Sequence, residues 1–186
     1  MMFPFISVLI GISLVYYIRQ RKAEKEMNGI VGSLPSASNE QLSLGTRDLC
    51  LDLLRQLNCE VEQKGEDIYF TYQKEHFMVE ASNEFSFITI WNFHWDKVDS
   101  ENTHEVEKMK KAVNRTNHLV SNTVLYMSYK DEKAYYVLSK VQRLLMQNIP
   151  NTKVYLAAIL DEFFRTKYCY CMVLDDINKD STDGVK

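Results

Sequence analysis

The sequence has few cysteines, and they are not regularly spaced. Its 186 residues contain four, at positions 50, 59, 169 and 171. No two of them form a CxxC pair, and four are too few for the disulfide framework of a small secreted domain. Cys169 and Cys171 would point about 200° apart on a helix, so they could not bind one metal ion together. We therefore expect free thiols and a reducing compartment.

Sequence motifs of common enzymes and cofactor sites are also missing. The six glycines form neither GxGxxG nor a phosphate-binding loop, and no GxSxG nucleophile turn occurs. None of the four histidines lies in HExxH; His104 and Glu105 match only its first two letters. The sequence thus predicts no catalytic residues, no bound metal and no cofactor.

The charges are dispersed along the chain. There are 22 basic and 25 acidic side chains, which gives a net charge of −3, and no long block has one sign. Proteins that bind nucleic acid through a basic arm concentrate Lys and Arg. We therefore do not expect nucleic acid as a partner.

Residues 1–18 contain no charged side chain and are almost wholly apolar. As a helix they would span about 27 Å, close to the thickness of a thin hydrocarbon core. Tyrosines at the end of this run fit an interfacial aromatic belt, and basic residues follow at once. The predicted anchor comprises Phe3, Phe5, Ile6, Leu9, Ile12, Leu14, Tyr16, Tyr17, Arg19, Arg21 and Lys22.

A cleaved signal peptide is the alternative for residues 1–18. It would need basic residues before the apolar run and a small-residue cleavage site after it, whereas here the charges come after and Ala-x-Ala is absent. Basic residues that follow a span resist translocation. We therefore expect an uncleaved, single-pass helix in the inner (plasma) membrane, with the rest of the chain in the cytoplasm.

A charged stalk and a flexible linker, residues 19–39, follow the anchor, and a domain is expected over residues 40–174. Its first helix begins either near Ser38, where Gln41 would complete a capping box, or near Thr46, followed by Asp48. The apolar stripe of this helix runs from Leu49 to Leu57.

Residues 67–95 predict a meander of three antiparallel strands. Apolar residues alternate over 68–72 and 77–81, and residues 85–95 are apolar on both faces. Lys74-Glu75 and Asn83-Glu84 are the expected hairpin connections, and residues 59–63 can add a short strand before the meander.

The remaining chain predicts a helix over about 102–120, a hairpin of residues 123–129 and 134–141 or slightly beyond, and a final helix over about 154–174. Residues 175–186 are polar and are expected to fray. The fold class is therefore α+β, an antiparallel sheet covered by helices in the order α-β-β-β-α-β-β-α, preceded by one transmembrane helix.

The element order and two short segments resemble the YbjN family, whose fold is similar to that of type III secretion chaperones. One segment is residues 77–90, FMVEASNEFSFITI, and the other is residues 113–117, VNRTN, where Asn114 and Asn117 precede the second hairpin. The resemblance implies regulatory or chaperone-like binding and no catalytic residues. Side-chain amides near a helix end can bond leftover backbone groups, so we expect a structural role for both asparagines.

Aromatic residues are in excess on the meander, on both strand faces. Some should remain on a surface, where aromatic side chains favour protein contacts, and Tyr69, Trp95 and Tyr129 are the candidates. The sequence therefore predicts a membrane-tethered, non-enzymatic domain that binds a protein; a homodimer is compatible with it. The alternative is a small-molecule sensor or enzyme that uses the cleft between sheet and helices.

Overall fold

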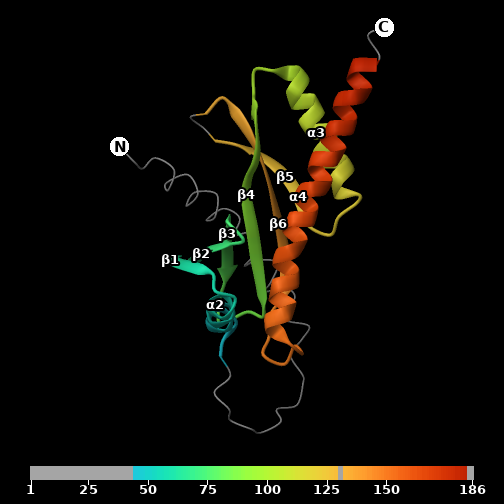
Figure 1. Ribbon diagram of the computed structural model, residues 1–186. Coiled ribbons are helices and arrows are strands. Elements are labelled where there is room, and N and C mark those ends of the chain that lie inside the picture. The colour runs from blue at the N-terminus through green and yellow to red at the C-terminus, as the bar shows by residue number, and fades with distance from the viewer. Residues whose placement is uncertain (1–43, 130–131, 184–186) are drawn as a thin grey trace, which may run out of the picture. The chain divides into compact units, whose positions relative to one another are not determined.

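A computed structural model describes residues 44–129 and 132–183. Within them the order is helix, four strands, helix, two strands, helix (Figure 1). The helices are α2 (Thr46–Gln56), α3 (Thr103–Asn117) and α4 (Thr152–Asp183). The strands are β1 (Glu60–Lys64), β2 (Asp67–Tyr72), β3 (Glu75–Ala81), β4 (Phe87–Asp99), β5 (Thr123–Ser128) and β6 (Ala134–Leu144).

The six strands form one antiparallel sheet in the order β1-β2-β3-β4-β6-β5. The α+β class and the meander are confirmed, and the optional strand before the meander is present as β1. The connection between β2 and β3 was predicted at Lys74-Glu75, and this is wrong by one residue. It is Gln73-Lys74, with φ of 48° and 70°, because Glu75 already belongs to β3. Two consecutive positive φ values are typical of the tight turns that join twisted strands.

The helices pack against one face of the sheet in two adjoining clusters. In the first cluster, α2 and the early turns of α4 cover β2, β3 and β4, and Phe163 of α4 meets Phe77 of β3 edge-on at 5.4 Å. In the second, α3 and the later turns of α4 cover Val124 of β5 and Val137 of β6. Trp95 is packed against both clusters. This burial of apolar area is the main force that holds the helices on the sheet.

Helix α4 is longer than the sequence predicts. It continues through Asp183 instead of ending near Leu174, so the expectation of a frayed tail from residue 175 is wrong for residues 175–183. Ile177 is 5% exposed and lies in the second cluster with Tyr170. Tyr170 and Ile177 are seven residues, or two helical turns, apart, so they lie on the same face of α4. Ile177 therefore anchors the polar residues 175–183 to the core.

Helix α2 begins at Thr46, the later of its two predicted starts. Its N-terminal amides are capped from the β3–β4 connection: Asn83 Oδ1 accepts from the N–H of Arg47 at 2.9 Å and of Asp48 at 3.2 Å. Asn83 Nδ2 also donates to the Asp48 carboxylate at 2.9 Å. A Cβ at position 45 would collide with the Asn83 side chain, which is why glycine suits that position.

The predicted anchor, residues 1–18, and the linker, residues 19–39, lie outside the described residues. Within residues 44–129 and 132–183, no helix combines the length and the apolar content needed to cross a membrane.

Candidate binding surface

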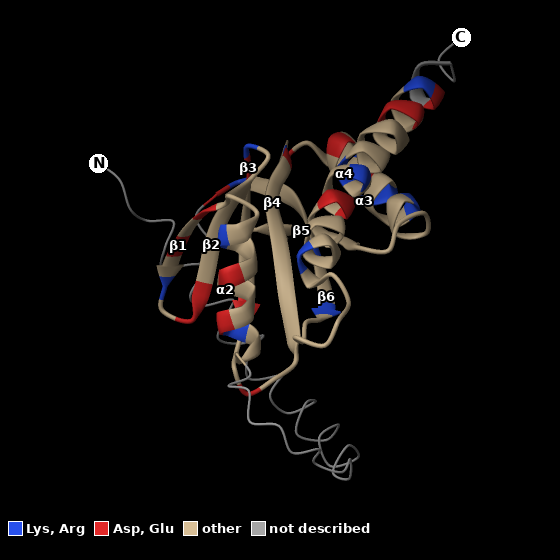
Figure 2. Cartoon of the chain, turned by 60° about the horizontal axis from the view of Figure 1, so that its bottom comes forward, with Lys and Arg blue, Asp and Glu red and all other residues tan. Residues whose placement is uncertain are grey.

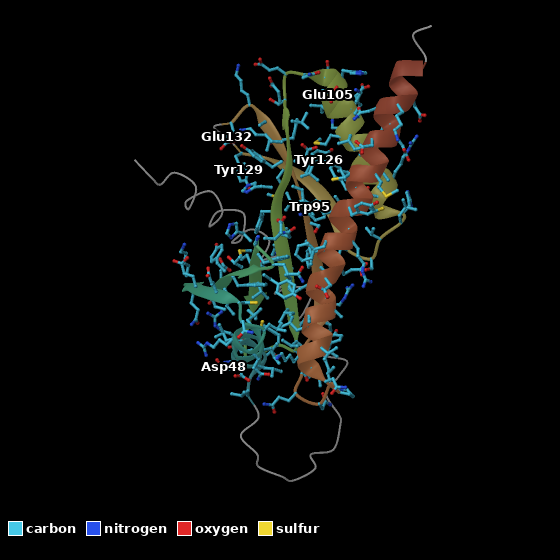
Figure 3. All side chains as sticks on the ribbon, in the orientation of Figure 1. Asp48, Trp95, Glu105, Tyr126, Tyr129 and Glu132 are labelled. Atoms are coloured by element: carbon cyan, nitrogen blue, oxygen red, sulfur yellow. The ribbon has the colours of Figure 1, made fainter. Side chains whose placement is uncertain are left out.

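The predicted surface aromatics occupy three different environments. Tyr69 is half-buried on β2, and the Lys64 ammonium lies 5.3 Å from its ring centroid. Trp95 is half-buried between the core clusters, with its ring 6.4 Å from that of Tyr170, and it donates its indole N–H to Asn92. Tyr129 is only 8% exposed, so the prediction that it lies on the surface is wrong. Figure 3 labels Trp95 and Tyr129 on the ribbon.

Tyr129 is buried because it belongs to an aromatic cluster beside an irregularity in β4. The register between β4 and β6 shifts between Asn92 and Asp96, and His94 there has φ of 60°. The His94 ring lies 5.0 Å from Tyr136 and 6.1 Å from Tyr129, whose hydroxyl is 3.3 Å from His94 Nε2. His94 is itself exposed, and the partial loss of solvent around its ring lowers its pKa, which favours the neutral imidazole in the folded protein. A bulge turns these side chains into mutual contact, which sequence periodicity cannot indicate.

The two asparagines of the VNRTN segment have different surroundings. Asn117 donates Nδ2 to the Val124 carbonyl at 2.9 Å and accepts the Val124 N–H at 2.8 Å. It therefore joins the end of α3 to β5 through both backbone groups of one residue. Asn114 is exposed on the surface of α3.

Strand β5 is the outer strand at one end of the sheet. Tyr126, labelled in Figure 3, is 37% exposed on it and meets Tyr135 edge-on at 5.6 Å. The Lys110 ammonium of α3 lies 5.9 Å from the Tyr126 ring centroid. This aromatic residue was not among the predicted surface residues; the available signal was the absence of charge from residues 123–128.

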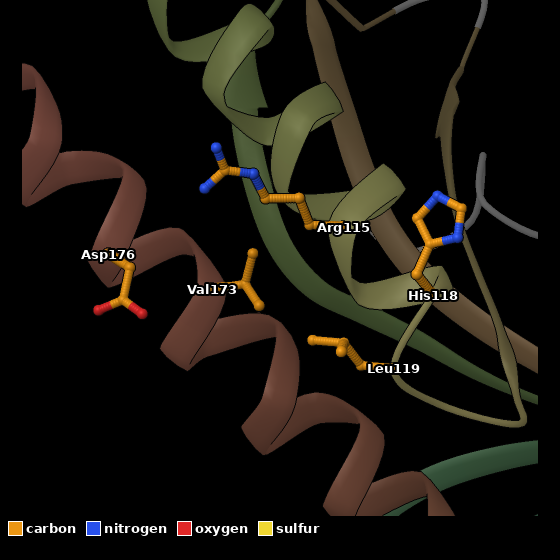
Figure 4. A pocket seen from close by; sticks show the side chains of 5 residues that line it. All are labelled: Arg115, His118, Leu119, Val173 and Asp176. Atoms are coloured by element: carbon orange, nitrogen blue, oxygen red, sulfur yellow. The ribbon is translucent and has the colours of Figure 1, made fainter.

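A shallow groove of about 310 Å³ lies between the C-terminal end of α3 and the later turns of α4 (Figure 4). Its floor is apolar: Leu119 is 67% exposed, and Val173 packs against the second core cluster. Arg115, His118 and Asp176 supply polar groups around it. The groove lies between two helices, whereas the alternative of a small-molecule sensor or enzyme expected a cleft between sheet and helices. The residues that line it from the α3 end and from α4 are 54 or more positions apart in the chain, so no local pattern indicates that they meet.

Acidic side chains crowd the β1 side of the sheet, where Asp67 of β2 lies directly opposite Glu80 of β3. Burial, and secondarily the Asp67 charge, raise the pKa of Glu80 to about 7; a hydrogen bond from Trp91 and the charge of Lys140 oppose this. Burial, and then the charge of Glu66, raise the pKa of Asp67 as well. The charge of Asp67 thus disfavours ionisation of the directly opposed Glu80 carboxyl.

The four cysteines are free thiols, as predicted. Cys50 is 1% exposed in the first cluster, and burial raises the pKa of its thiol to about 12, which keeps it protonated and unreactive. Among the residues that the structure describes, no three His, Cys, Asp or Glu side chains come together in a metal-binding arrangement.

These features define an α+β domain that carries an apolar helix–helix groove and an uncharged outer strand. By sequence, the chain matches no family model and no curated protein.

Two solved structures are similar to it. The crystal structure of YbjN from E. coli, described there as a proposed transcription regulator, matches 72% of this chain and 92% of its own at 9% identity, with a TM-score of 0.47. An uncharacterized protein from Methanothermobacter thermautotrophicus matches 70% of this chain and 97% of its own at 10% identity, with a TM-score of 0.46. At these identities the likeness concerns the fold alone.

Proposed function

We propose that this chain is a membrane-tethered, non-enzymatic domain that binds a partner protein in a regulatory or chaperone-like role. Residues 1–18 would hold it in the inner membrane, and residues 19–39 would link it to a cytoplasmic domain. The partner would dock an apolar helix in the groove between α3 and α4.

The groove is the observation that supports this role. Leu119 and Val173 offer apolar area, and the rim carries the opposite charges of Arg115 and Asp176. An amphipathic helix can bury its apolar face in such a groove while its polar residues meet the charged rim. The Leu119 side chain would be the centre of the contact, because it is the exposed large apolar residue of the groove and a partner would remove its surface from water.

The groove is tested by comparing two equally exposed apolar residues. Leu119 lies in the groove, and Val154, near the start of α4, is also 67% exposed. The full chain is purified from membranes in mild detergent as wild type, Leu119→Glu and Val154→Glu. We expect co-purifying protein to be lost from Leu119→Glu and retained by Val154→Glu. Equal retention in both variants would refute the groove as the partner site.

The alternative is a small-molecule sensor or enzyme, and the volume of the groove is the observation that favours it. About 310 Å³ is at the lower limit of ligand pockets, and Arg115 with His118 could hold an anionic group. Thermal-shift screening of the full chain against anionic metabolites distinguishes the two roles. A stabilising metabolite whose effect Arg115→Ala abolishes, without any partner protein lost from Leu119→Glu, would favour the sensor.

The membrane topology has its own test. Alkaline phosphatase is active only where its disulfides can form, so a fusion after Lys186 should be inactive if the domain is cytoplasmic. Strong activity would place the domain outside the membrane and favour the signal-peptide alternative.

A further inference from the structure

The outer edge of strand β5 presents backbone N–H and C=O groups, and those of one residue, Val124, are already hydrogen-bonded. In an antiparallel ladder, successive residues direct their N–H and C=O alternately toward opposite neighbours. Both backbone groups of Val124 bond the Asn117 side chain, so they point away from β6. By the alternation, the backbone N–H and C=O of Tyr126 and Ser128 point away from β6 as well. The structure gives the backbone groups of Tyr126 and Ser128 no partner within the described residues. The open part of this edge is therefore two outward residues with Met127 between them.

This open part lacks the usual protection against strand addition. Exposed edge strands are commonly blocked by charged residues, proline or bulges. Residues 123–128, TVLYMS, contain no charge and no proline, and the pairing with β6 is regular throughout. Within residues 44–129 and 132–183, the group that blocks this edge is the Asn117 side chain, which covers Val124.

We propose that β5 pairs with β5 of a second copy of this chain, antiparallel, about a two-fold axis through Met127. In that register Tyr126 of each copy is opposite Ser128 of the other. Both are outward residues, so each pair exchanges two N–H···O=C bonds and the junction contains four. The alternative register, centred on Tyr126, would need Val124 opposite Ser128, and Asn117 prevents this. Asn117 therefore selects the register as well as closing one end of the edge.

Charge complementarity favours a second copy as the occupant. Two uncharged strands place no like charges opposite each other. On the adjoining helix α3, Glu107 and Lys110 are both exposed and one turn apart, and Lys110 reaches Tyr126 at this edge. A two-fold axis runs the two α3 helices in opposite directions, so Lys110 of each copy approaches Glu107 of the other. This pairing lies on the β5 side of α3 and is independent of the proposed groove partner.

Oxidative cross-linking of the full chain in mild detergent tests the register. Directly opposed residues in a non-hydrogen-bonded pair have Cα atoms about 4.5 Å apart, within the range for a disulfide. Met127→Cys should therefore give several-fold more covalent dimer than the wild type, whose four native cysteines set the background. Glu62→Cys is the matched control, because residue 62 is exposed at the centre of the opposite edge strand β1.

Two further variants separate this register from other contacts. Tyr126→Cys should cross-link less than Met127→Cys, and adding Asn117→Ala should raise it, because Val124 becomes available and the register centred on Tyr126 becomes possible. Leu119→Glu should leave the Met127→Cys cross-link unchanged, so failure of the groove proposal would not affect this result. A Met127→Cys yield no higher than that of Glu62→Cys, or a monomer by sedimentation at all concentrations, would overturn the proposal.

Discussion

The two outer strands of the sheet are protected by different means. Strand β1 has charged side chains at three of its five positions, Glu60, Glu62 and Lys64, and it carries red and blue segments in Figure 2. Strand β5 has none in six, and its protection is the Asn117 amide bonded to one residue. Charge repels any added strand along the whole of β1, whereas a single amide blocks one position. The comparison indicates that β1 is closed to association and β5 is partly open.

Charged side chains on the β1 side of the sheet make the stability of the fold depend on pH, whereas the Asn117 amide beside β5 does not. The acidic residues beside β1 include Asp67 and Glu80, and burial raises the pKa of both. The charge of Glu66 raises the pKa of Asp67 further, and the charge of Asp67 raises that of Glu80. An amide carries no charge and so adds no such dependence on pH. We therefore expect the β1 side to account for more of the pH dependence of folding.

The largest expected effect is that of Glu80→Gln at pH 8. The folded pKa of Glu80, about 7, lies above its ordinary value of 4.5, so the folded state binds more protons between these values. The free energy of unfolding then falls as pH rises from about 4.5 to about 7 and stays low above it. Replacing the carboxyl should stabilise the protein at pH 8 by on the order of 3 kcal/mol at most, and by less at pH 5.

Urea unfolding of the full chain at the two pH values measures this gain. Glu60→Gln is the control, because Glu60 is exposed on the neighbouring strand β1. A Glu80→Gln gain that is equal at pH 5 and pH 8 would mean that titration of Glu80 is not its cause.

Asn117→Ala should have the next largest effect. It removes two hydrogen bonds and leaves the Val124 N–H and C=O without their partner, which costs on the order of 1 to 2 kcal/mol. Asn114→Ala is the control: that residue is exposed, and its replacement should change the melting temperature little. Similar losses from both variants would contradict the separate roles assigned to the two asparagines.

Asn83→Ala tests the corresponding polar contact on the β1 side. It removes the cap of α2, and lost caps cost about 1 kcal/mol. Ser82→Ala is a suitable neighbour control, because Ser82 bonds only the N–H of Glu84 within the same connection. Thermal unfolding compares the two, and an undiminished melting temperature in Asn83→Ala would show that water replaces the cap.

The smallest expected effect on stability is that of Ser128→Lys. Ser128 is exposed on β5, so the free energy of unfolding should change by roughly 0.5 kcal/mol or less. The new charge should nevertheless protect β5 as β1 is protected, so sedimentation should show less dimer than the wild type. If the amount of dimer were unchanged, β5 would not be the strand through which the two copies pair.

Most of the secondary structure could be predicted from the sequence, because alternation and helical spacing are local signals. The meander of residues 67–95 and the helix that became α3 follow from their apolar periods alone. Boundaries were less predictable: α4 passes its expected end because Ile177 finds a place in the second cluster, and that contact depends on helix α3. The anchor and linker predictions concern residues outside those described and stay predictions.

The candidate surfaces could be predicted only in part. Tyr129 was a reasonable surface candidate from its place at the end of a strand, but the β4 bulge brings His94 and Tyr136 against it. Trp95 lies between two clusters whose members come from three helices and the sheet. No local pattern reports such contacts, since they join residues far apart in the chain.

The sequence alone determined the α+β class, the order of the elements, the absence of a disulfide pattern and the lack of charge on residues 123–128. Each of these depends on composition or on spacing between near neighbours. The tertiary structure decided that Asn83 caps α2, that Asn117 bonds Val124, that a groove forms beside Leu119 and that β5 rather than β6 lies at one edge of the sheet. These depend on which distant segments pack together, because a hydrogen bond or a groove exists only once both of its sides are in place.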